Sequence, residues 1–228
     1  GSLFSQQTVY VSSTGAGSSD GTSEQNAYGN FANALLDINS NGDKLIVIGT
    51  VTVGAATISD KNFAFTIEGK DATSTITGSG GTSRLFTLNQ STTIDVTLKD
   101  LTFSNYNTTL AGGGVLFSNN AGATVTFDNC IFTGNSVTNN QGGGVIFFAN
   151  GTLNIIDSSF KNNTSSDEGG AISANSGSIS ISNSVFESNS AATKGGAIYS
   201  GSANFTITGS TFYKNETTGI GNSDGGAA

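Results

Sequence analysis

The 228-residue chain has no histidine, proline, methionine or tryptophan, and Cys130 is its single cysteine. Without histidine there is no imidazole base, no imidazole metal ligand, and no Ser–His or Cys–His nucleophile pair. One cysteine gives neither an internal disulfide nor a thiolate metal cluster. The chemistry that remains is therefore carboxylate chemistry.

Positive charge is also scarce, because eight Lys and Arg stand against sixteen Asp and Glu and give a formal net charge of −8. This sign disfavours nucleic-acid phosphates and anionic lipid headgroups as partners. No apolar run approaches the roughly 20 residues of a membrane span, and no signal peptide starts the chain. We expect a soluble piece without nucleic-acid binding or membrane insertion, and interpret residues 1–2 as a cloning remnant.

Glycine is abundant, at 32 residues, and part of it belongs to a repeat that begins near residue 93. One mark is a glycine pair, a small residue and usually Val or Ile: Gly112-Gly113-Gly114-Val115, Gly142-Gly143-Gly144-Val145, Gly169-Gly170-Ala171-Ile172, Gly195-Gly196-Ala197-Ile198 and a degenerate Gly225-Gly226-Ala227. The second mark is a phenylalanine with an asparagine three residues later: Phe132/Asn135, Phe160/Asn163, Phe186/Asn189 and Phe212/Asn215. Phe103 is an exception, because Tyr106 stands in the asparagine position.

The residues before each phenylalanine alternate between apolar and polar, as in a strand with one buried face. The apolar residues five positions before it are Leu98, Phe127, Ile155, Ile181 and Ile207. A unit this small cannot bury its own apolar face, but it can stack on its neighbours. The repeat predicts an all-β fold, a single-stranded right-handed parallel β-helix of about nine coils with roughly 25 residues each.

Equivalent side chains of successive coils are expected to stack in rows. The asparagines of the repeat should form a structural, hydrogen-bonded ladder at one corner: Asn135, Asn163, Asn189 and Asn215. Cys130 shares its row with Ser158, Ser184 and Ser210, which predicts a buried, inert thiol.

The first part of the chain has a weaker period. Tyr10-Val11 and residues 45–48 are predicted to form strands, and Phe31, Ala34, Leu35 and Ile38 between them fall at helical spacing. We expect residues 3–42 to form an N-terminal cap, with a short helix covering the open edge and apolar end of the first coil. Residues 43–228 should form the coils. Because the chain stops at a repeat mark without a polar cap, we expect an array truncated at its C-terminus.

The paired marks, as in Phe186-Glu187-Ser188-Asn189 with Gly195-Gly196-Ala197-Ile198, resemble the repeats of chlamydial polymorphic outer-membrane proteins and of adhesin-like surface proteins of methanogenic archaea. The opening, Tyr10-Val11-Ser12-Ser13-Thr14-Gly15 followed by Asp20-Gly21-Thr22-Ser23, is similar to the start of secreted pectate-lyase-like β-helix domains. The resemblance implies a right-handed β-helix displayed on a cell surface, with adhesion as its usual role.

An alternative is a polysaccharide lyase or glycoside hydrolase on the same fold, because a fold does not determine function. A lyase of this type needs a base, and Arg84 is the one arginine. The repeat places Asp100 and Asp157 in one outward row, two coils apart, with Asn129 between them. This spacing, near 10 Å, is wider than the roughly 5 to 9.5 Å that separates a hydrolase carboxylate pair.

One segment resembles the first half of a calcium loop: Asp37, Asn39 and Asn41, before Gly42. Its twelfth position, where a bidentate glutamate belongs, is Ile48, so a helix end with a glycine turn is the simpler interpretation. We expect no cofactor, and Ca²⁺ is the one metal candidate.

A second alternative is an ice-binding solenoid, which uses a flat, regular threonine face. Thr97, Thr126 and Thr206 share a row, but Asn154 and Ser180 interrupt it, and the next row contains Lys99 and Asp128.

Asn-x-Ser/Thr triplets make four asparagines candidates for glycosylation in a secreted chain: Asn89, Asn107, Asn150 and Asn204. Asn163 and Asn215 also begin such triplets but belong to the expected ladder, so we expect both to be unmodified.

Together these patterns favour an extracellular, adhesin-like surface protein whose β-helix is a platform or stalk. Its expected partner is a glycan or protein on the surface of another cell, bound by a monomer. Tyr199, Tyr213 and Lys214 are the candidate binding residues, because aromatic and donor groups on an outward face suit sugars or proteins. We predict no catalytic residues.

Overall fold

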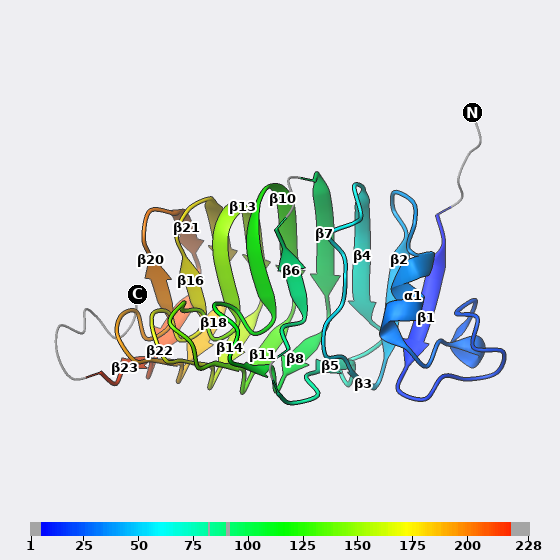
Figure 1. The fold of residues 1–228 in the computed structure, drawn as a ribbon, viewed down its shortest axis with the longest axis horizontal. Helices are drawn as coiled ribbons and strands as arrows, with labels where there is room; N and C mark the ends of the chain where they lie inside the picture. The colour runs from blue at the N-terminus through cyan, green and yellow to red at the C-terminus, as the bar shows by residue number, and fades with distance from the viewer. Residues whose placement is uncertain (1–5, 82, 90–91, 220–228) are drawn as a thin grey trace.

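The computed structural model describes residues 6–81, 83–89 and 92–219, so residues 1–2 and the Gly225-Gly226-Ala227 mark lie outside the described residues. The chain winds into a right-handed parallel β-helix (Figure 1), which confirms the predicted fold class. All strand pairs are parallel, and each turn of the later coils contributes to three sheets.

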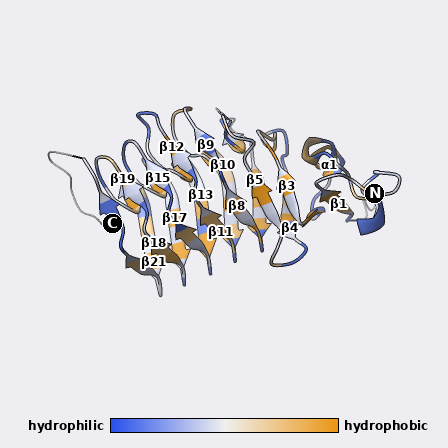
Figure 2. Ribbon diagram, turned by 90° about the horizontal axis from the view of Figure 1, so that it is seen from below, coloured by the Kyte–Doolittle hydropathy of each residue, from blue (hydrophilic) through white to orange (hydrophobic). Residues whose placement is uncertain are grey.

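The largest sheet has eleven strands: β1 (Thr8–Ser12), β2 (Lys44–Ile48), β4 (Ala64–Gly69), β6 (Phe86–Leu88), β7 (Ile94–Lys99), β10 (Leu116–Asp128), β13 (Ile146–Ile156), β16 (Ile172–Ala174), β17 (Ser178–Ser182), β20 (Ile198–Ser200) and β21 (Asn204–Thr208). It bends into two walls. The front wall contains β6, β16, β20 and the first halves of β10 and β13, whereas the back wall contains β1, β2, β4, β7, β17, β21 and the second halves of β10 and β13 (Figures 1 and 2).

Two smaller sheets close the cross-section. The seven-stranded sheet contains β3 (Thr50–Thr52), β5 (Thr75–Thr77), β8 (Thr102–Ser104), β11 (Ile131–Thr133), β14 (Ser159–Lys161), β18 (Val185–Glu187) and β22 (Thr211–Tyr213). The five-stranded sheet contains β9 (Asn107–Thr108), β12 (Ser136–Val137), β15 (Thr164–Ser165), β19 (Ser190–Ala191) and β23 (Glu216–Thr217).

The solenoid has about six turns. The prediction of nine coils was therefore wrong, for two physical reasons. Stacked residues of the seven-stranded sheet lie 25 residues apart at Val51 and Ile76 but 29 apart at Phe103 and Phe132. In addition, much of the chain before β2 forms the cap.

One continuous hydrophobic core fills the solenoid. Strands alternate buried and outward residues, as in β7 and β17, and Figure 2 shows most hydrophobic residues on the strands. Phenylalanine rings stack along the axis in the later coils, with centroids 4.4 Å apart for Phe132 and Phe160 and 4.6 Å apart for Phe160 and Phe186. Such offset stacking adds stability beyond the buried area.

The glycine marks form the turn that enters the front wall. Gly113, Gly143, Gly169 and Gly195 all have positive φ, and a Cβ on Gly113 would lie 1.9 Å from the carbonyl oxygen of Leu116. Only glycine fits there. The strand register aligns Leu116, Ile146, Ile172 and Ile198, so the alignment of the first two marks needs a shift of one residue: Gly113 and Gly143, not Gly112 and Gly142, match Gly169.

The cap contains the helix α1 (Phe31–Asp37) and the 3₁₀ turn η1 (Glu24–Asn26). Phe31, Ala34, Leu35 and Ile38 are buried in the common core, as their spacing predicts. The helix does not cover the free edge of β1, however. The segment 21–28 does this, because Tyr10 N–H donates to the Gly21 carbonyl at 3.0 Å and Tyr28 N–H to the Tyr10 carbonyl at 2.8 Å.

Candidate functional site

Four asparagines stack in a continuous ladder at the corner before the five-stranded sheet; Asn135, Asn163 and Asn189 are buried, and Asn215 is half-buried. Asn135 Nδ2 donates to Asn163 Oδ1 at 3.0 Å, Asn163 Nδ2 to Asn189 Oδ1 at 3.0 Å, and Asn189 Nδ2 to Asn215 Oδ1 at 2.9 Å. The Oδ1 atoms of Asn163, Asn189 and Asn215 each also accept the backbone N–H of the preceding asparagine of the ladder, at 3.1 Å for Asn163. These side chains are therefore committed to the fold.

Tyr106 ends this ladder at its first turn. Its backbone N–H donates to Asn135 Oδ1 at 3.1 Å, and its buried hydroxyl donates to the Val53 carbonyl at 2.8 Å. Burial raises the pKa of Tyr106. The departure from the repeat at this position is thus a structural cap between the regular and the irregular turns.

Arg84 has an equivalent role at the glycine turns. In later coils the glycine-turn carbonyls accept N–H groups from the preceding coil, as Gly143 accepts from Gly113 at 3.0 Å. The described residues of the coil before Gly113 form no such turn, and the Arg84 guanidinium donates to the carbonyls of residues 111–113 instead, with Nε 2.7 Å from the Gly113 oxygen. Burial lowers its pKa to about 10.

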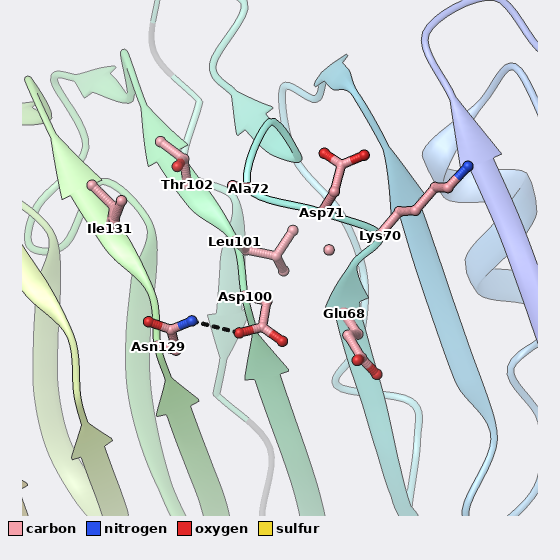
Figure 3. A pocket seen from close by; sticks show the side chains of 10 residues that line it. Glu68, Lys70, Asp71, Ala72, Asp100, Leu101, Thr102, Asn129 and Ile131 are labelled. Atoms are coloured by element: carbon pink, nitrogen blue, oxygen red, sulfur yellow. Dashed lines mark hydrogen bonds between the residues drawn. The ribbon is translucent and has the colours of Figure 1, made fainter.

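The outward carboxylate row lies at the corner between the back wall and the seven-stranded sheet. Asp100, Asn129, Asp157 and Asn183 all have φ near +50°, a left-handed conformation that Asp and Asn tolerate well. Asn129 Nδ2 donates to Asp100 Oδ1 at 2.6 Å (Figure 3). Corner geometry therefore accounts for these residue types.

A cavity of about 350 Å³ opens beside this row, where the residues 70–74 replace the short corner of the later coils (Figure 3). Three carboxylates border it, and each has a partner within the protein. Glu68 lies 2.6 Å from Lys44 Nζ, Asp71 accepts from Thr73 N–H and Oγ1, and Asp100 accepts from Asn129. The Thr73 bonds lower the pKa of Asp71.

The three residues that the sequence analysis considered for a lyase or hydrolase, Arg84, Asp100 and Asp157, do not lie together. Arg84 lies at the front wall beside β6, with its guanidinium 4.7 Å from the Phe117 ring centroid. Asp100 and Asp157 lie at the corner after the back wall. Over residues 6–81, 83–89 and 92–219, no group of three or more Cys, Asp or Glu side chains is arranged to hold a metal ion.

The back wall has two chemically different halves. Its outward residues on β4, β7 and β10 include ion-paired charges, such as Lys99 and Asp128 at 3.3 Å. Those on β13, β17 and β21 are uncharged: Thr152, Asn154, Ile156, Ser178, Ser180, Ser182, Asn204, Thr206 and Thr208. A shallow hollow of about 300 Å³ crosses this half. The row of Thr97 and Thr126 continues through Asn154 and Ser180 to Thr206 in the expected register.

The three candidate binding residues point from two different sheets. Tyr199 is on β20 of the front wall, with Lys194 Nζ 5.5 Å from its ring centroid. Tyr213 is on β22 of the seven-stranded sheet, 42 % exposed, and is hydrogen bonded to Glu187, which raises the pKa of Tyr213. Lys214 is exposed in the corner after it. They do not form one site.

The calcium-like segment is closed by internal bonds. Tyr28 hydroxyl donates to Asp37 Oδ2 at 2.7 Å, and Asn41 Oδ1 accepts the Ala64 N–H at 3.2 Å. Asn39 Oδ1 accepts from the Ser40 hydroxyl at 3.1 Å. The buried Asp43 carboxylate accepts the N–H groups of Gln7, Asn39 and Ser40 and so organises the turn.

Among the glycosylation candidates, Asn107 and Asn204 are exposed and Asn150 is half-buried, while Asn89 lies at the exposed end of β6. Cys130 is buried, and burial raises the pKa of its thiol to about 12.

A family model described as "Right handed beta helix region" matches residues 6–228, so the chain belongs to this family. The family occurs in both enzymes and non-enzymes, and it fits the pectate-lyase-like or adhesin-type fold that the repeats resemble. No curated protein and no solved structure gave a match. In the part of the chain that the structure describes, no helix is long and apolar enough to cross a membrane.

Proposed function

We propose that the chain is part of an extracellular, adhesin-like surface protein, and that its β-helix is a non-catalytic platform for attachment to a glycan on another cell. The uncharged half of the back wall is the observation that carries this proposal. In a chain with net charge −8, three successive coils present outward hydroxyls and amides without one charge.

These groups are available to a ligand. The side chains of Thr152, Ser178, Ser180, Asn204 and Thr206 make no hydrogen bond with any residue that the structure describes. Asn154 Nδ2 donates one bond, of 3.3 Å, to Thr126 Oγ1. A neutral surface of donors and acceptors on a rigid scaffold suits the hydroxyls of sugars. The non-catalytic assignment is supported by the separation of Arg84 from Asp100 and Asp157.

The test is a glycan and polysaccharide array, with and without Ca²⁺, followed by ultraviolet and reducing-sugar readouts of cleavage. Saturable binding without product is expected. Product formation would instead favour the lyase or hydrolase alternative and would contradict the proposal, as would the absence of binding to every glycan. Thermal hysteresis measured on the same sample would favour the ice-binding alternative.

A pair of variants tests whether the back wall carries the binding. Ser180→Lys places a charge at the centre of the hollow and should weaken binding at least tenfold. Thr133→Lys, the control, places the same charge on β11 of the seven-stranded sheet and should leave binding unchanged. Equal effects of the two variants would exclude the back wall as the binding face.

A further inference from the structure

A groove on the front side of the first turns holds the two buried cations of the described chain, Lys61 and Arg84. It follows the connection between β3 and β4, which passes between α1 and β6 (Figure 1) and pairs with β6 through Ala56 and Phe86. Two cavities, of about 340 and 210 Å³, share Ala55, Ala56 and Thr57 along this connection. We call the two cavities together the α1–β6 groove.

Neither cation has a carboxylate partner among the described residues. Five other lysines form ion pairs with acidic residues at the surface: Lys44, Lys70, Lys99, Lys161 and Lys194. Lys61 Nζ donates to the Ile38 carbonyl at 2.8 Å, and neither it nor Arg84 forms an ion pair with any described residue. A buried cation without a counter-charge is costly, because its desolvation is not offset.

The larger cavity has the chemistry of an anion site. Its polar lining consists of Arg84, the hydroxyls of Thr57, Ser59 and Thr87 and the amide of Asn89, and no carboxylate is among the lining residues. The one acid of the groove, Asp60, lines the smaller cavity beside Lys61. Leu85, Ala55 and Ala56 complete the larger cavity with apolar surface.

Arg84 is already held in position for a ligand. Three of its five N–H groups donate to the carbonyls of residues 111–113, and its Cζ lies over the Phe117 ring, 4.7 Å from the ring centroid. A fourth N–H, on Nη1, donates to Thr87 Oγ1 at 3.3 Å. The fifth has no acceptor among the described residues. A fixed guanidinium edge beside a hydroxyl is suited to carboxylate or sulfate oxygens.

We propose that the α1–β6 groove binds the carboxylate or sulfate group of an acidic sugar. The anion is the missing partner of Arg84, while the choice of a sugar rests on the proposed function. In this arrangement Arg84 Nη1 and the Thr87 hydroxyl contact the anionic group. Thr57, Ser59 and Asn89 bond the sugar hydroxyls, and Leu85 and the two alanines pack against the apolar face of the ring. A cavity of about 340 Å³ is within the range of small-ligand sites.

The test compares methyl β-D-glucuronide with methyl β-D-glucoside, which differ in the carboxylate alone, by titration of the ¹⁵N-labelled chain in NMR. The glucuronide should shift the amide signals of Thr57, Ser59 and Thr87 and bind at least tenfold more tightly than the glucoside. Glucose 6-sulfate, titrated in parallel, distinguishes the two anions, and saturable binding of either anion in the groove supports the proposal.

Arg84→Gln should reduce glucuronide binding at least tenfold, whereas Lys161→Gln, which removes an exposed cation on the seven-stranded sheet, should not change it. Because Arg84 also caps the glycine turn, Thr57→Val serves as a second variant that keeps the fold and should weaken binding about threefold. The proposal would be overturned if neither the glucuronide nor glucose 6-sulfate bound more tightly than the glucoside, if the shifts lay outside the groove or were absent, or if both groove variants left the binding unchanged.

These experiments distinguish a failure of the anion site from a failure of the proposed attachment function. Glucuronide binding in the groove with no glycan bound on the array would support the anion site and contradict attachment. Array binding that Arg84→Gln and Thr57→Val leave unchanged, with no glucuronide bound, would support attachment and contradict the anion site.

Discussion

The later turns and the first turns of this solenoid satisfy their buried polar groups in different ways. From β9 onward, each coil bonds to an almost identical neighbour through the asparagine ladder and the glycine turns. The described residues of the first turns form no such ladder, and individual side chains bond the buried backbone groups instead: Asp43 closes the turn after α1, Tyr106 ends the ladder, and Arg84 caps the first glycine turn.

The difference shows where a repeat protein can acquire a specific site. A perfect repeat presents the same surface in every coil, as on the uncharged half of the back wall. The corner cavity of Figure 3 and the α1–β6 groove both lie where the repeat is interrupted by longer connections. Residues of different type then meet in one place, which is what selective binding of one ligand requires.

The largest expected effect is in the middle of the ladder. Asn163→Ala removes donors to the Phe132 carbonyl and Asn189 and an acceptor for Asn135, all fully buried. Since each orphaned buried group costs about 1 to 3 kcal/mol, we expect a loss of about 4 kcal/mol in the free energy of unfolding, measured by urea denaturation. Asn215→Ala, at the end of the ladder, should cost about half as much. Equal losses would mean that the ladder is not cooperative.

A smaller effect is expected at the boundary between the two regions. Tyr106→Phe keeps the ring in the core but leaves the Val53 carbonyl without its 2.8 Å bond from the tyrosine hydroxyl. We expect a loss of about 1 to 2 kcal/mol in the free energy of unfolding. Tyr199→Phe, which removes a surface hydroxyl, is the control and should change it by less than about 0.5 kcal/mol. If the two variants cost the same, Tyr106 does not connect the regions as described.

The smallest effect concerns the cap. Hydrogen bonds from the Ser18 hydroxyl and from the Thr22 hydroxyl and N–H lower the pKa of the exposed Asp20 to about 2. Because the pKa is depressed in the folded state, the stabilising effect is present above the ordinary pKa near 4 and is lost as the pH falls through 2. Ser18→Ala should raise the pKa of Asp20 in an NMR titration. An unchanged pKa would show that Ser18 does not hold the carboxylate.

The sequence predicted the repeating part of this molecule well, and for a physical reason. A residue such as Asn163 or Phe160 recurs because it contacts the equivalent residues of the adjacent coils. Its spacing along the chain therefore predicts which residues it contacts. The alternation around Ile155 likewise identified the buried face of the strands. The register of the glycine turns was wrong by one residue in two copies, because three consecutive glycines look alike in sequence.

The irregular part was not accessible in the same way. Nothing in the residues around Lys61 marks it as buried. Arg84 was considered in the sequence because it is the one arginine that could be the base of a lyase, and its burial was not predicted. Tyr199 and Tyr213 are close in sequence, yet consecutive strands of one turn face different directions, so they belong to separate surfaces.

Composition, charge and period thus determined the class of fold, the identity of the core and the absence of histidine and disulfide chemistry, since these depend on residue types and local spacing alone. Tertiary structure decided which single side chains replace a missing neighbour and which segments border a common groove. Those relations join residues from different turns, such as Thr57, Arg84 and Gly113, whose proximity arises when the coils stack.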